Sequence, residues 1–154
     1  MRLTGIIDED FVNYRLPSMF LSVSKCNNTC TGCQNQHLKS AKAIEVDNNS
    51  IAARYMGNPL TKAIVFGGLE PFDSFDELCV CYEVLRLYTN DTIVIYTGYN
   101  ENELRTFVKE LIKFGGHLII KYGQYIKDQE THKDEILGVK LASDNQYAKE
   151  YNKI

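Results

Sequence analysis

Three cysteines stand close together in the segment CNNTCTGC, at positions Cys26, Cys30 and Cys33. The apolar run just before them predicts a β-strand over residues 19–24, so this C-x-x-x-C-x-x-C loop begins at a strand end. A loop this short keeps all three sulfur atoms within reach of one metal centre. Thiolates are soft ligands that select zinc, copper(I) or iron–sulfur clusters. Three thiolates with no obvious fourth would hold a four-iron cluster and leave one iron open for chemistry.

A structural zinc site is the alternative for the same loop. Cys26, Cys30 and Cys33 together with His37 form a Cys₃His ligand set, which zinc accepts. Structural zinc sites usually combine two short ligand pairs across a longer arm, and the sequence has no second pair. The spacing therefore favours an iron–sulfur cluster, and a zinc-stabilised binding module without catalysis remains the other reading.

Two more segments whose residues could bind a ligand follow predicted strands. Gly67 and Gly68 end an apolar run over residues 63–66, and glycines at a strand exit let a ligand approach the backbone closely. Glu70 adds an acceptor beside them, and Pro71 stiffens the turn. The run 92–96 ends at Tyr96 and continues into Thr97 and Gly98. The other two cysteines, Cys79 and Cys81, flank the apolar stripe of a predicted helix, and we interpret them as small buried hydrophobic residues.

Elements that could position these residues alternate along the chain. Strands are predicted over 19–24, 63–66, 92–96 and 118–122, and helices over 51–56 and 74–89 and after Asn100. Ser74 and Glu77 have the form of a capping box, Asn100 can cap the following helix, and Gly115-Gly116 can end it. The N-terminal eighteen residues and the run 136–141 are candidates for additional strands. The stretch 34–50 has no clear pattern.

The alternation predicts an α/β fold built from βαβ units around parallel strands. A closed eightfold barrel needs about 250 residues, so 154 residues supply a partial (β/α) barrel or a small open sheet. In either arrangement the cysteine loop, the Gly67-Gly68 turn and the Tyr96-Thr97 turn share the rim at the carboxyl ends of the strands. We expect one domain over 1–154, with a core of about 17–123 and a C-terminal extension of 124–154.

Composition limits the classes of function. The chain is 44% hydrophobic and 24% charged, which is typical of a folded globular protein. Its net charge of -3, without a lysine- or arginine-rich run, argues against a nucleic-acid partner. The start becomes acidic too soon for a signal peptide, and no apolar run is long enough to cross a membrane. We therefore expect a cytoplasmic protein, in which five cysteines serve as metal ligands or free thiols and not as disulfides.

The cysteine spacing after the first strand, combined with Gly-Gly-x-Glu-Pro after the second, resembles the radical S-adenosylmethionine (SAM) superfamily. Within it, the segments TGCQN (31–35), IYTGY (95–99) and ASDNQ (142–146) resemble the activating proteins of anaerobic ribonucleoside-triphosphate reductase. The resemblance covers residues 17 to 147, and Gly32 before the third cysteine is common in these activators. Relatives often carry a Gly-Pro-Gly-type loop before the first strand, where this chain has VNYRLP (12–17), so no ligand contact is carried over there.

The resemblance implies a radical SAM enzyme that generates a glycyl radical. Cys26, Cys30 and Cys33 would hold three irons of a 4Fe-4S cluster, and the fourth iron would bind the amino and carboxylate groups of SAM. Among the cofactor-binding residues, Gly32 would adjoin the cluster, Tyr96 and Thr97 would lie beside the ligand, and the methionyl end would contact Gly67, Gly68 and Glu70.

The resemblance also implies partners and a reaction. A flavodoxin or ferredoxin-type protein would supply an electron, SAM would be cleaved, and the 5′-deoxyadenosyl radical would take a hydrogen atom from a glycine of the reductase. Activation of another glycyl-radical enzyme, or a radical SAM reaction on a small metabolite, is the alternative within this class. A partial barrel without a second domain has little material to close its mouth, which favours a glycine on a protein loop as the substrate.

Overall fold

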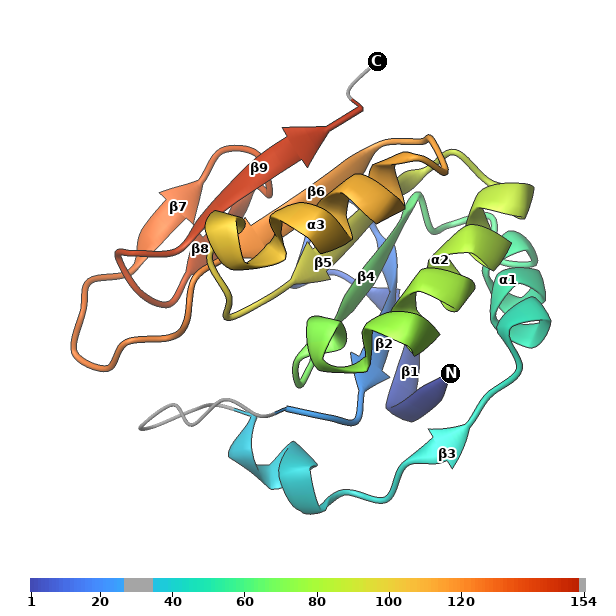
Figure 1. The fold of residues 1–154 in the computed structure, drawn as a ribbon, viewed down its shortest axis with the longest axis horizontal. Coiled ribbons are helices and arrows are strands. Elements are labelled where there is room, and N and C mark those ends of the chain that lie inside the picture. The colour runs from blue at the N-terminus through green and yellow to red at the C-terminus, as the bar shows by residue number, and fades with distance from the viewer. Residues whose placement is uncertain (27–34, 153–154) are drawn as a thin grey trace.

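The structure is a computed structural model that describes residues 1–26 and 35–152 (Figure 1). Within these residues the chain forms a large mixed sheet, a small two-stranded sheet and three α-helices, which confirms the α/β class. None of the described helices is both long and apolar enough to cross a membrane. In chain order the elements are β1 (Arg2–Asp10), β2 (Ser18–Val23), the 3₁₀ helix η1 (Gln36–Ser40), β3 (Ile44–Glu45), α1 (Asn48–Met56), β4 (Ala63–Gly68), the 3₁₀ helix η2 (Pro71–Ser74), α2 (Phe75–Tyr88), β5 (Thr92–Tyr96), α3 (Glu101–Ile112), β6 (Leu118–Tyr122), β7 (His132–Asp134), β8 (Val139–Leu141) and β9 (Tyr147–Tyr151).

The large sheet has the strand order β3-β1-β2-β4-β5-β6-β9. The four strands in its middle, β2, β4, β5 and β6, are parallel, as the sequence predicted. Its outer strands β1, β3 and β9 are antiparallel to their neighbours, so the prediction of parallel strands alone is wrong. The sheet is open in the described residues, with β3 and β9 at its edges, and the partial barrel stays a prediction.

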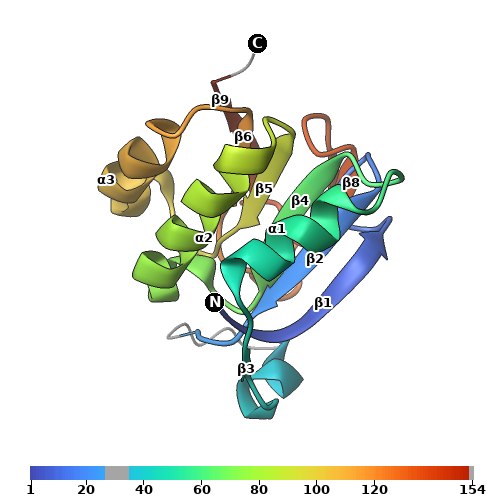
Figure 2. The ribbon, with the colours of Figure 1, turned by 90° about the vertical axis from the view of Figure 1, so that its right-hand side faces the viewer.

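All three helices cover the same face of this sheet (Figure 2). The parallel strands are added in one direction along the sheet, and right-handed crossovers that advance in one direction put every helix on the same side. Alternate residues of the strands, such as Leu21, Phe66, Ile95 and Ile120, pack against the helices in the larger core cluster. No α-helix of residues 1–26 and 35–152 covers the opposite face, which we call the helix-free face.

The helix-free face carries a second, smaller core cluster. Val65, Val94 and Ile119 project to it from the central strands, where they meet Leu137 and Leu141 from the C-terminal part of the chain. Tyr14, Leu137 and Leu141 of β8 therefore cover part of this face. Residues closer to the carboxyl ends remain to line a cavity.

Of the two helix N-caps predicted from the sequence, the structure contains the one at Asn100 but not the one at Ser74. Asn100 caps α3 in a complete capping box: its side chain accepts from the Glu103 N–H, and the Glu103 carboxylate accepts from the Asn100 N–H. The capping box predicted for Ser74 and Glu77 is wrong, because the Ser74 side chain makes no capping bond. The 3₁₀ helix η2 leads directly into α2 there, and the Glu77 carboxylate accepts from the backbone N–H of Arg2.

Candidate active site

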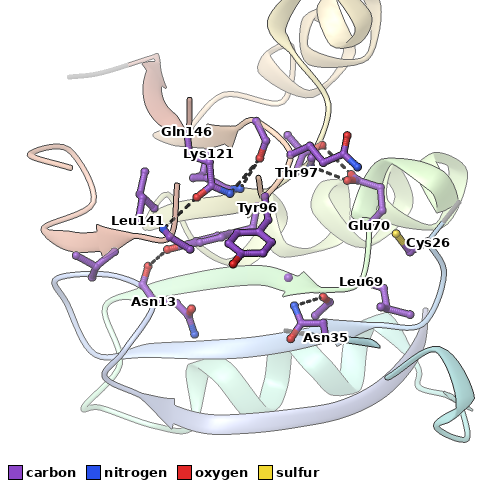
Figure 3. Close-up of a pocket in the computed structure, with 18 of the residues that line it drawn as sticks. Asn13, Cys26, Asn35, Leu69, Glu70, Tyr96, Thr97, Lys121, Leu141 and Gln146 are labelled. Atoms are coloured by element: carbon purple, nitrogen blue, oxygen red, sulfur yellow. Dashed lines mark hydrogen bonds between the residues drawn. The ribbon is translucent and has the colours of Figure 1, made fainter. Parts of the chain in front are cut away.

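A cavity of about 440 Å³ lies on the helix-free face, at the carboxyl ends of the parallel strands (Figure 3). Parallel α/β sheets usually bind ligands at this edge, because the loops after neighbouring strands meet there. The walls come from the loop after β1, the ends of β2, β4, β5 and β6, and the C-terminal segment. The described residues that line it are Val12, Asn13, Phe20, Cys26, Asn35, Leu38, Gly67, Gly68, Leu69, Glu70, Tyr96, Thr97, Gly98, Lys121, Gly123, Gln124, Tyr125, Val139, Lys140, Leu141, Ala142 and Gln146.

Cys26 brings the cysteine loop to this cavity. It follows β2, is half-buried and lines the cavity wall. The other two predicted ligands, Cys30 and Cys33, and the predicted cofactor contact Gly32 lie outside the described residues. A half-buried thiol beside a ligand-sized cavity has the position and the chemistry that an iron–sulfur ligand requires.

Both described ends of the cysteine loop are bonded to the turn after β4. The Glu70 N–H donates to the carbonyl of Lys25, the residue before Cys26, at 2.8 Å. The Asn35 side-chain amide donates to the Gly68 carbonyl at 2.7 Å. The turn at residues 68–70 therefore fixes the entry and the exit of the loop.

Gly67 and Gly68 line the cavity as predicted, and their lack of side chains also has a packing reason. Gly68 has a φ of +84°, a left-handed conformation that favours glycine, and a Cβ there would lie 2.3 Å from the Ser22 hydroxyl oxygen. A Cβ on Gly67 would lie 3.0 Å from two ring atoms of Phe20. Both glycines thus let β2 and β4 approach each other.

Glu70 is almost completely buried, with 3% of its surface exposed, and its carboxylate bonds to protein donors. Oε1 accepts from the Phe72 N–H at 3.2 Å and the Thr97 hydroxyl at 2.8 Å, and Oε2 accepts from the Gly98 N–H at 2.8 Å. Burial raises the pKa of Glu70 to about 7, although these hydrogen bonds act in the opposite direction. The structure thereby joins two residues that the sequence predicted separately, Glu70 and Thr97.

Tyr96 and Lys121 project from neighbouring strands toward the cavity (Figure 3). The Tyr96 hydroxyl donates to the Asn13 carbonyl at 2.6 Å, so it also fixes the segment after β1. Burial raises the pKa of Tyr96. The Lys121 ammonium lies 5.6 Å from the centre of the Tyr96 ring and donates to the Gly123 carbonyl at 3.0 Å. Lys121 is a buried cation in the cavity wall that the sequence analysis missed.

The C-terminal segment forms another wall of the cavity. The Gln146 side chain accepts from the N–H groups of Ala142 and Ser143, and its amide donates to the Gly123 carbonyl at 3.2 Å. These bonds hold the turn 142–146 against the end of β6. The chain therefore has more material around the cavity than its length suggested.

Cys79, Cys81 and His37 are not among the described residues that line the cavity. Cys81 is buried in the larger core cluster and Cys79 packs against it, as predicted. Burial raises the pKa of both thiols, to about 12 for Cys81. His37, the fourth ligand of the zinc alternative, is exposed on η1.

Two signals in the sequence could have identified more of the cavity. Lys121 is a lone charged residue in the otherwise apolar strand 118–122, and Gln146 belongs to the segment ASDNQ, which was noted only for its resemblance. Asn35 likewise belongs to the segment TGCQN, which was noted only for its resemblance. Asn13 had no comparable signal, because its position depends on how the loop after β1 folds back over the sheet.

Comparison with known proteins gives one result that bears on this site. Residues 15–147 match a family model described as a 4Fe-4S single cluster domain. The match includes the three cysteines and every predicted site residue. Searches of curated proteins and of solved structures gave no match.

Proposed function

The chain belongs to the 4Fe-4S single cluster domain family, and on this premise we propose that it is a radical SAM enzyme that activates anaerobic ribonucleotide reductase. The observation that carries the proposal is that Cys26, the first cysteine of C-x-x-x-C-x-x-C, lines the same cavity as the Gly67-Gly68 and Tyr96-Thr97 turns. A ligand in this cavity would lie against Cys26, the first residue of the loop that would hold the cluster. That proximity is what cluster-dependent cleavage of a small cosubstrate requires.

Cys26, Cys30 and Cys33 would hold the cluster, and the protein would leave one iron for the amino and carboxylate groups of SAM. When bound, the cluster and SAM supply a reductive cleavage that yields the 5′-deoxyadenosyl radical. The electron would come from a flavodoxin or ferredoxin-type partner. The chain's own residues would bind and orient SAM and exclude water from it.

Several features of the cavity support this role. Its volume of about 440 Å³ lies within the usual range for small-molecule sites, roughly 300–1,000 Å³. Apolar side chains of Phe20, Leu69, Tyr96 and Leu141 contribute to its lining and would exclude water. The two turns, at Gly67-Gly68 and at Thr97-Gly98, bring main chain to the cavity wall, where the polar parts of SAM would lie against it. The Gly68 carbonyl and the N–H groups of Thr97 and Gly98 already bond within the protein, so the other peptide groups of these turns would contact SAM.

The substrate in this proposal is a glycine on a loop of the reductase. The resemblance of TGCQN, IYTGY and ASDNQ to reductase-activating proteins supports it. One observation favours a small metabolite instead: Tyr125, Lys140 and Ala142 from the C-terminal segment line the cavity and give it a wall that an isolated partial barrel would lack. Activation of another glycyl-radical enzyme fits the same site.

Metal and product analysis tests the class of enzyme. Protein prepared without oxygen should carry about four irons and matching sulfide per chain, and it should form 5′-deoxyadenosine from SAM when a reductant is added. A single zinc per chain, with no deoxyadenosine, would identify the zinc-stabilised module.

Electron paramagnetic resonance tests the substrate. The loaded protein, SAM and a reductant are mixed with anaerobic ribonucleotide reductase, with a formate-lyase-type enzyme, or with no partner. A glycyl-radical signal that requires the reductase supports the proposal. A signal on the formate-lyase-type enzyme alone would transfer the function to that partner, and SAM cleavage without a radical on either protein would favour the metabolite.

A further inference from the structure

Three strand ends meet at Glu70. Its backbone N–H bonds to Lys25 after β2, the residue itself follows β4, and its carboxylate bonds to Thr97 and Gly98 after β5. The side chain is the connection between the second and third of these ends. A change at Glu70 therefore acts on the relative position of two turns that line the cavity.

The Glu70 carboxylate has little remaining capacity for a ligand. It already accepts three hydrogen bonds, two of them at 2.8 Å, and only 3% of the residue is exposed. The Thr97 hydroxyl is similarly occupied, since it donates to Glu70 and accepts from the Tyr99 N–H at 3.1 Å. Two of the three polar side chains predicted to contact the ligand, Glu70 and Thr97, thus bond to each other.

We propose that Glu70 is a positioning residue, which fixes the Thr97-Gly98 turn against the Gly67-Gly68 turn and so shapes the cavity for its ligand without touching that ligand. The inference rests on the proposed function, which supplies SAM as the ligand. The backbone of the two turns would contact SAM, and Glu70 would set their separation through the Thr97 hydroxyl and the Gly98 N–H.

A double-mutant cycle on SAM binding tests this role. Dissociation constants are measured by equilibrium dialysis without oxygen on the loaded full-length chain, for the wild type, Glu70→Gln, Thr97→Val and the double variant. Glutamine keeps the size of Glu70 but replaces one acceptor with a donor, and valine keeps the shape of Thr97 but lacks the hydroxyl. Each single change should weaken SAM binding by about tenfold, as expected for a lost charge-assisted hydrogen bond.

The double variant distinguishes positioning from direct contact. If Glu70 acts through Thr97, the double variant should bind SAM about as weakly as the weaker single variant. If each side chain touches SAM independently, the two losses will multiply, to about a hundredfold, and that result overturns the inference. Wild-type binding by Glu70→Gln overturns it as well.

Controls separate this inference from general damage and from the proposed function. Glu101→Gln is the matched change outside the cavity, where the Glu101 carboxylate bonds to Tyr147 and Lys149, and it should leave SAM binding unchanged. Iron content should stay at the wild-type level in every variant.

Should Glu70→Gln not fold, Thr97→Ser replaces it. Serine keeps the hydroxyl and should bind SAM like the wild type, while Thr97→Val should not. Wild-type affinity in both Thr97 variants overturns the inference.

The same experiment also tests the proposed function, through SAM binding by the wild-type chain. A wild-type chain that carries the cluster but does not bind SAM overturns the proposed function, and this inference with it. A wild-type chain that binds SAM, combined with multiplying losses, overturns only the role of Glu70.

Discussion

Single residues at the strand ends serve the fold and the site at once. Gly68 shows this most clearly, because its φ of +84° and its closeness to Ser22 both exclude a side chain. The same residue offers its carbonyl to Asn35 at the far end of the cysteine loop. A substitution at Gly68 therefore alters the pairing of β2 with β4, and β2 leads directly to Cys26.

We predict that Gly68→Ala lowers the free energy of unfolding by about 1–3 kcal/mol and reduces iron retention with it, because alanine is strained at this φ. Gly67→Ala is the matched control. Its Cβ would crowd the edge of the Phe20 ring, which can shift, and would lie at an ordinary contact distance of 3.8 Å from the Tyr96 Cβ, so its effect should be smaller. Urea denaturation and iron analysis without oxygen measure both quantities. Equal effects at the two glycines would contradict the explanation.

The buried carboxylate of Glu70 should make stability depend on pH. Its pKa is raised from 4.5 to about 7 in the folded chain, so between these values the folded state binds more protons than the unfolded state. Stability then falls as the pH rises from about 4.5 to 7. Compared with Glu70→Gln, the wild type should lose on the order of 3 kcal/mol across this window. Urea denaturation at several pH values measures the difference, and parallel curves for the two proteins would refute the prediction.

The cysteine loop makes a separate prediction. Cys30→Ala should abolish stable cluster binding, since two thiolates cannot hold three irons of a cube. Cys79→Ala should keep about four irons per chain, because Cys79 lies on α2 against the core. Iron and sulfide are measured after reconstitution without oxygen. Full iron content and SAM cleavage in the Cys30 variant would exclude the assignment of this ligand.

At the scale of elements, helix starts differ in how they satisfy their first N–H groups. The Asn100 side chain and the Glu103 carboxylate both bond at the start of α3, and Glu101 then links this helix to Tyr147 and Lys149 on β9. α2 instead follows directly on the 3₁₀ helix η2, and the Ser74 side chain makes no capping bond there. The sequence predicted a capping box at Ser74 and only an N-cap at Asn100, so the outcome depends on the turn that precedes each helix.

Asn100→Ala should therefore lower the free energy of unfolding by about 1 kcal/mol, the usual value of an N-cap. Ser74→Ala is the matched control: because the Ser74 side chain makes no capping bond, its effect should stay within about 0.5 kcal/mol. Thermal or urea denaturation compares the two variants. A larger loss at Ser74 than at Asn100 would contradict the assigned caps.

At the scale of the whole molecule, the order in which the parallel strands are added places the helices and the cavity on opposite faces of the sheet. The helices and the larger core occupy one face, and the cavity occupies the other. The C-terminal strand contributes to both, since β9 pairs with β6 along five residues and follows directly after Gln146. The Tyr151 hydroxyl lies 2.6 Å from that of Tyr122, which joins β9 to a strand of the larger core.

A chain that ends at Gln146 should lose β9 and expose the edge of β6. We expect lower solubility and a thermal midpoint reduced by about 5 °C or more, because an uncovered strand edge loses its hydrogen-bond partners and pairs with other chains. Tyr151→Phe, which removes only one hydroxyl group, should have a smaller effect. Thermal denaturation and size-exclusion chromatography compare both variants with the full chain, and a truncated chain as stable as the full one would refute this role of β9.

The sequence by itself determined the four parallel strands, the α/β class and the residues at the strand ends, because apolar runs, glycines and cysteines act through local geometry. It also indicated an additional strand among the first eighteen residues, which is β1, but not the direction of the outer strands. It did not indicate β9, since residues 147–151 form a half-exposed edge whose polar pattern carries little hydrophobic signal. Only the tertiary structure showed the hydrogen bonds between Glu70 and Thr97, between Asn35 and Gly68, and between Gln146 and Gly123. These bonds join residues that are 23 to 33 positions apart, and such pairings depend on how separate strands assemble and not on any local pattern.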